Sequence, residues 1–84
     1  MGQTTAVTFF SLGKDTSISQ ERYDVTSIYI GAKGTADFLI GDLAKKEPVS
    51  DGDCLIVPGD TLCGVETTTG TVYTEIIIKK ENRL

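Results

Sequence analysis

The chain has 84 residues, of which 39% are hydrophobic and 24% are charged, and its net charge is −4. These values are typical of one small globular domain, residues 1–84, and exclude a disordered chain. Because the basic residues form no cluster and no apolar run approaches the ~18 residues of a membrane span, we expect neither a nucleic-acid nor a membrane partner.

The first half of the chain predicts β-strands rather than helices. Short runs rich in Val, Ile, Thr, Tyr and Phe recur between glycine-bearing turns, which indicates an all-β fold. We expect a first strand at residues 5–10 and a loop at 11–19. Residues 23–30 and 35–40 flank GAKG (31–34) and predict a hairpin. In its second strand, Ala36, Phe38 and Ile40 share one face.

The second half continues the same pattern, with turns expected where glycine and aspartate are adjacent. Pro48 limits residues 43–50 to a turn or a short edge strand. Further strands are expected at residues 53–58, 61–67 and 71–80. Six to eight short strands at this spacing predict a small barrel or sandwich.

The run Ile76-Ile77-Ile78 predicts an interface, because neighbouring residues of a strand point to opposite faces. One apolar face fills the core and the other must be covered. We expect a second copy of the chain to cover it, giving a homodimer. The alternative is that loops of the same chain cover it.

The cysteine content argues against a zinc site. Cys54 and Cys63 lie nine positions apart, which fits no common zinc spacing, and the chain has no histidine. No export signal is recognisable at the start of the sequence, so we expect a cytoplasmic protein with reduced thiols.

The stretch GDCLIVPGDTLCGVET (52–67) resembles the second conserved motif of the cupin superfamily. That motif runs glycine, five residues, proline, a glycine-bearing turn, histidine, three residues and asparagine. Gly52 and Pro58 keep its spacing, and the turn glycine comes one position early at Gly59. Cys63 occupies the position of the histidine, and Thr67 that of the asparagine.

Upstream, residues 18–40 resemble the first cupin motif, with Gly34 as its closing glycine. Counting back places Ser27 at the acidic metal ligand of the family, and Tyr23 and Glu21 near its two histidines. The resemblance covers about residues 9–79. It implies a small antiparallel double-sheet β-barrel, usually dimeric, with a pocket at its mouth.

The residues at the four ligand positions, Glu21, Tyr23, Ser27 and Cys63, make a poor metal site. Imidazole is absent, the phenol must lose a proton at a pKa near 10, and a serine hydroxyl is a weak ligand. We therefore expect no metal and no cofactor. A thiol nucleophile needs a base, usually histidine, so we expect Cys63 to line the pocket rather than to react.

Together these points predict a small-molecule binding or sensing module, rather than an enzyme, that acts as a homodimer. Its pocket would be formed by Glu21, Tyr23, Ser27 and Cys63, and their polar groups suggest a small polar ligand. Two alternatives stay open. The first is a degenerate metalloenzyme, an isomerase or oxygenase relative, that uses Glu21 and Cys63 as ligands. The second is a structural subunit whose function is its oligomer interface.

Overall fold

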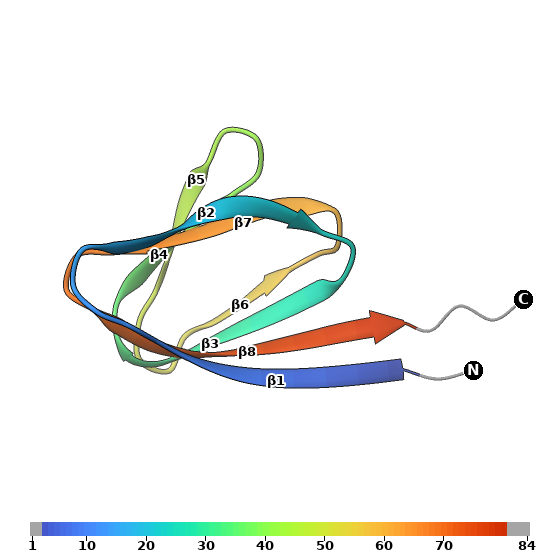
Figure 1. The fold of residues 1–84 in the computed structure, drawn as a ribbon, viewed down its shortest axis with the longest axis horizontal. Coiled ribbons are helices and arrows are strands. Elements are labelled where there is room, and N and C mark those ends of the chain that lie inside the picture. Colours follow the sequence, from blue (N-terminus) through green and yellow to red (C-terminus); the bar gives the residue numbers. More distant parts are fainter. Residues whose placement is uncertain (1–2, 81–84) are drawn as a thin grey trace, which may run out of the picture.

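The computed structural model describes residues 3–80, and these form eight β-strands (Figure 1). The strands are β1 (Gln3–Leu12), β2 (Thr16–Tyr23), β3 (Thr26–Gly34), β4 (Ala36–Ile40), β5 (Lys45–Val49), β6 (Cys54–Val57), β7 (Thr61–Thr67) and β8 (Thr71–Lys80). No helix that could cross a membrane is present in this range.

The strands form two four-stranded antiparallel sheets with the orders β1-β8-β3-β6 and β2-β7-β4-β5. Eight strands arranged in this way form a jelly roll. Figure 1 shows the two sheets meeting where β1 continues into β2 and β7 into β8, and diverging toward the other end. The predicted all-β, double-sheet architecture is therefore confirmed.

The core lies between the sheets and is dominated by aromatic rings. The buried hydrophobic residues are Tyr29, Ala36, Phe38, Val49, Val57, Cys63, Val65 and Tyr73. The ring of Phe38 lies 4.5 Å from that of Tyr29 and 5.3 Å from that of Tyr73, measured between centroids. Tyr73 also stacks on Phe10 at 5.0 Å. Ala36 and Phe38 face this core, as predicted, and Ile40 packs against it.

The loop predicted at residues 11–19 is wrong, because most of that segment is strand. β1 continues to Leu12, and β2 begins at Thr16, so the turn is confined to residues 13–15. β2 is an edge strand that pairs with β7 alone. An edge strand tolerates serine and charged side chains, because much of its surface faces water.

The hairpin predicted around residues 31–34 is also wrong. β3 runs on to Gly34, and β4 then joins the other sheet, so the two strands do not pair. Glycine is needed at this crossing. Gly34 has φ +74, and a Cβ on Gly31 would lie 2.1 Å from the carbonyl oxygen of Ser50. The predicted strand at 23–30 starts too early as well, since Tyr23 ends β2.

The predicted edge strand is confirmed. β5 contains Pro48 and lies at the edge of its sheet, where a missing backbone N–H leaves no ladder bond unmade. Turns also occupy Gly41-Asp42, residues 51–52 and residues 59–60, as expected.

The outer surface of the β1-β8-β3-β6 sheet is apolar. Cross-strand pairing places one residue of each strand in a row, and this row consists of Val7, Ile76, Ile28 and Ile56. The neighbouring rows consist of Phe9, Thr74, Ile30 and Cys54, and of Thr5, Ile78 and Thr26. We call these three rows the outer apolar face. Phe9 is 77% exposed and Ile56 is 62% exposed, so the described part of the chain leaves this face open.

The outer surface of the other sheet is charged. Asp37 and Glu66 are paired across β4 and β7, and Lys46 Nζ lies 3.1 Å from Glu66 Oε2. The two sheets therefore present opposite chemistry to their surroundings.

Candidate functional site

A cavity of about 170 Å³ lies between the two sheets. It is lined by Phe10, Ile18, Tyr23, Ser27, Tyr29, Phe38, Cys63, Gly64, Val65, Tyr73, Glu75 and Ile77. These residues come from six strands of both sheets. Because side chains alternate along a strand, every second residue of β3 and β8 points inward to form this lining. Most of its walls are hydrocarbon and aromatic ring.

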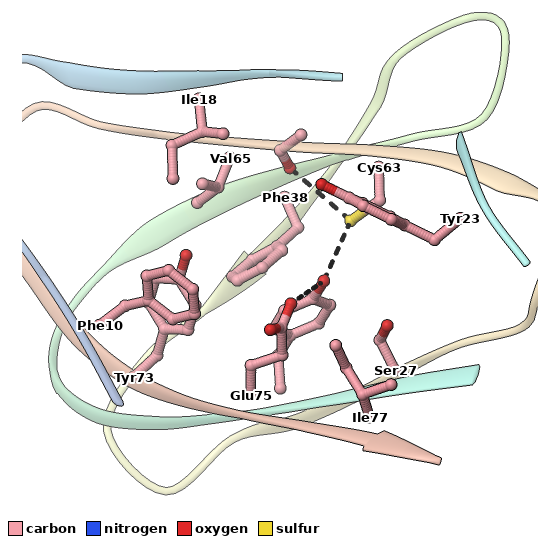
Figure 2. A pocket seen from close by; sticks show the side chains of 12 residues that line it. Phe10, Ile18, Tyr23, Ser27, Phe38, Cys63, Val65, Tyr73, Glu75 and Ile77 are labelled. Atoms are coloured by element: carbon pink, nitrogen blue, oxygen red, sulfur yellow. Dashed lines mark hydrogen bonds between the residues drawn. The ribbon is translucent and has the colours of Figure 1, made fainter. Parts of the chain in front are cut away.

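A chain of hydrogen bonds crosses the cavity (Figure 2). The Cys63 thiol donates to Tyr29 Oη at an S···O distance of 4.0 Å, and the Tyr29 hydroxyl donates to Glu75 Oε2 at 3.0 Å. Tyr29 and Glu75 are directly paired across β3 and β8, so their side chains share the inner face. Three polar groups of a mostly apolar cavity are thus connected along one line.

The phenols and the thiol around the cavity stay protonated at neutral pH. Burial, followed by the nearby charge of Glu75, raises the pKa of Tyr73 to about 12. Burial also raises the pKa of Tyr29 far above its ordinary value, with Cys63 and Glu75 adding to the effect. The pKa of Cys63 is raised by burial as well. None of these three groups therefore supplies a negative charge or a thiolate nucleophile.

Tyr23 stands at the edge of the cavity, where β2 ends. It is 43% exposed, and its hydroxyl donates to Glu21 Oε2 at 2.7 Å. This hydrogen bond, followed by partial burial and the charge of Glu21, raises the pKa of Tyr23 to about 12. Arg22 stands between Glu21 and Tyr23 in the sequence. Its Nη2 lies 3.4 Å from Asp42 Oδ1, and its Nη1 lies 3.7 Å from Asp60 Oδ1. Arg22 also donates to the backbone oxygen of Asp60 at 2.8 Å, which attaches the end of β2 to the neighbouring turn.

The structure brings the four predicted site residues to one end of the fold. Tyr23, Ser27 and Cys63 line the cavity, and Ser27 is buried. Glu21 does not line it, but it pairs with Cys63 across β2 and β7 and holds the Tyr23 hydroxyl.

Glu75 was not predicted as a site residue from the sequence. It stands beside the isoleucine run of β8, and that run predicted a buried strand and a dimer interface instead of a site. A signal was available, because Tyr73, Glu75 and Ile77 alternate and must share one face of the strand.

The residues at the family's metal positions do not fit a metal. Glu21 and Cys63 face each other across two strands, yet within residues 3–80 no three His, Cys, Asp or Glu side chains come together as a possible metal site. The remaining two positions hold the Tyr23 phenol, which keeps its proton, and the Ser27 hydroxyl. This donor set is weaker than the three or four imidazole, thiolate or carboxylate ligands that transition metals require.

No protein-family model and no curated protein matches the sequence. Solved structures do match. A conserved protein of unknown function from Streptococcus pyogenes superposes with a TM-score of 0.86 at 18% identity, over 98% of this chain and 70% of that one. An RmlC-like cupin from Shewanella frigidimarina superposes with a TM-score of 0.82 at 12% sequence identity, over 93% of this chain and 68% of that one. A cupin superfamily protein from Desulfitobacterium hafniense superposes with a TM-score of 0.80 at 18% sequence identity, over 94% of this chain and 79% of that one. At these identities the likeness shows the fold alone.

Proposed function

Since the chain has the RmlC-like cupin fold, we propose that it is a small-molecule binding module and that the cavity between its sheets is the binding site. The observation that supports this is the cavity itself, which combines apolar walls with one line of polar groups. Its volume of about 170 Å³ is close to that of an engineered ~150 Å³ cavity that binds benzene. The ligand is therefore about the size of one six-membered ring with a short polar substituent.

Binding is favoured over catalysis by the chemistry of the lining. Burial raises the pKa of Cys63, and its hydrogen-bond partners are the Tyr29 hydroxyl and the backbone oxygen of Gly64, neither of which is a base at neutral pH. The metalloenzyme alternative relies on Glu21 and Cys63, which are two ligands without a third. The structural-subunit alternative predicts a filled barrel, and the cavity counts against it.

The test is a chemical-shift titration of ¹⁵N-labelled protein with benzyl alcohol, a neutral probe of the right size. We expect the amide signals of cavity residues to shift, with a dissociation constant in about the millimolar range or below. Ile77 lines the cavity whereas its neighbour Ile78 lies on the outer apolar face. Ile77→Phe fills part of the cavity and should weaken binding about tenfold or more, while Ile78→Phe should leave it unchanged. Equal binding by both variants, or no binding by the unaltered protein, contradicts the proposal.

We propose further that the protein acts as a homodimer through the outer apolar face. This face carries no charged residue in its three rows, whereas the outer surface of the other sheet is charged. A matching surface must also be uncharged and flat, and a second copy of the chain supplies one. Two identical faces related by a two-fold axis then cover each other.

The size of the face supports this pairing. Strands about 4.8 Å apart, with same-face side chains about 6.7 Å apart, give roughly 400 Å² for three rows across four strands. Two such faces bury roughly 800 Å² in total, which lies in the size range of weak and transient interfaces. An apolar patch of roughly 400 Å² is comparable to the largest patch on a typical monomer, and such patches are often functional.

Sedimentation equilibrium tests the dimer, because the chain mass is 9.0 kDa and a dimer has twice that mass. We expect the dimer at micromolar concentrations. Ile56→Lys places a charge in the face and should yield the monomer. Leu43→Lys is the matched control, since Leu43 is 95% exposed on a turn of the other sheet. A monomer at about 100 µM, or a dimer that persists in Ile56→Lys, refutes the proposal.

A further inference from the structure

We infer that the cavity selects a small organic cation, such as an arylalkyl or alkyl primary amine, over anions of the same shape. The inference rests on the proposed binding function and names the class of ligand. It is carried by the position of Glu75, by the absence of basic side chains from the lining, and by the aromatic walls.

Glu75 supplies the only formal charge among the twelve lining residues. Its side chain is partly buried, and one of its oxygens accepts the hydrogen bond from Tyr29. Among the side chains of residues 5–79 it forms no ion pair. An ionised carboxylate accepts about four hydrogen bonds, so capacity for a donor from a ligand remains. A carboxylate removed from water is stabilised most by a cation, and a bound ammonium group provides one.

No basic side chain is among the twelve residues that line the cavity. Arg22 binds Asp42 and Asp60. Lys46 pairs with Glu66 on the outer surface of its sheet. Lys79 shares the inner side of β8 with Glu75 but is four residues away, about 13 Å along the strand.

Glu21 adds a second carboxylate at the edge of the cavity, where it holds the Tyr23 hydroxyl. Two carboxylates, Glu21 and Glu75, therefore stand at or in the cavity, and negative charge of this kind favours cations over anions.

The aromatic walls favour the same ligand. The rings of Tyr29, Phe38 and Tyr73 lie within 5.9 Å of one another, and Phe10 stacks on Tyr73. An ammonium group within about 6 Å of a ring centroid is attracted by the ring quadrupole. The hydrocarbon part of the ligand packs on the same rings, while its N–H groups reach Glu75.

The experiment compares three probes of one shape at neutral pH, namely benzylamine, benzyl alcohol and benzoate. Chemical-shift titrations should show benzylamine binding about tenfold or more tightly than benzyl alcohol, and benzoate binding more weakly than both. Glu75→Gln keeps an acceptor for the Tyr29 hydroxyl. It should reduce benzylamine affinity about tenfold or more, and by a larger factor than it reduces benzyl alcohol affinity.

Glu66→Gln is the matched control, because it removes the same charge from the outer surface of the other sheet. It should leave all three affinities unchanged, and thermal unfolding verifies that both variants fold. If benzyl alcohol binds and benzylamine binds no more tightly, the cation inference fails while the binding function stands. If none of the probes binds, both fail. An equal loss of benzylamine affinity in Glu66→Gln and Glu75→Gln also overturns the inference.

Discussion

Raising the pH should unfold the protein through its tyrosines. All three tyrosines of the chain line the cavity, and the chain has no tryptophan to obscure their spectra. Tyr73 is 3% exposed, and burial together with the charge of Glu75 raises its pKa to about 12, against 10 in the unfolded chain. Cys63 and Tyr23 also face it and raise its pKa further.

The sign of the effect follows from the direction of the shift. A raised pKa means that the folded state keeps a proton that the unfolded state releases. The stabilisation is therefore complete below pH 10 and is lost as the pH rises toward 12. Two pKa units correspond to about 2–3 kcal/mol from Tyr73, and Tyr29, whose pKa is also raised by burial, adds to this. A domain of this length has a free energy of unfolding of about 4–12 kcal/mol, so these losses consume much of it.

The assay records tyrosinate absorbance and far-ultraviolet circular dichroism across the same pH series. Ionisation of the buried phenols should coincide with loss of β-structure, at a midpoint well above pH 10. Tyr73→Phe removes one ionising group and should move that midpoint to higher pH. A phenol that titrates near pH 10 in the folded protein refutes the Tyr23–Glu21 hydrogen bond if it is Tyr23, and refutes the buried aromatic cluster if it is Tyr29 or Tyr73.

Three substitutions test the packing that forms the cavity, each by urea unfolding. Phe38→Ala should lower the free energy of unfolding by about 3–5 kcal/mol, because Phe38 is fully buried between two tyrosine rings; a loss below about 1 kcal/mol contradicts that burial. Thr67→Val removes hydrogen bonds of 2.8 and 3.0 Å to backbone atoms and should cost about 1–3 kcal/mol. Gly31→Ala places a Cβ 2.1 Å from a carbonyl oxygen and should destabilise strongly, whereas Gly13→Ala meets no atom within 4 Å and serves as control.

The sequence predicted local strand character well and the pairing of strands poorly. Alternation and turn residues are local signals, and they identified β4, β5 and β8. Whether consecutive strands pair depends on contacts with strands far along the chain, so the hairpin across residues 31–34 was wrong. β2 was not predicted, because an edge strand rich in Ser, Gln, Glu and Arg lacks the alternating apolar residues that indicate a strand.

The site was predicted in part for a similar reason. Motif spacing pointed to Ser27 and Cys63, which line the cavity, because spacing along two strands determines which residues face inward. Glu75 lies outside both motifs, so no resemblance pointed to it. Only its alternation with Tyr73 and Ile77 on β8 indicated the inner face.

Strand β1 differs from the edge strands β2 and β5 in its lack of protection against aggregation. Its ten residues include no charged side chain and no proline, and it lies at the edge of its sheet. The edge strand β5, by contrast, carries two lysines and Pro48, which are residues that block the addition of a further strand. Unpaired backbone groups on a long, uncharged edge are a template for amyloid-like growth. The strand that completes the outer apolar face is thus also the one from which fibrils would extend, and dispersal of the concentrated protein depends on keeping the free edge of β1, opposite β8, covered.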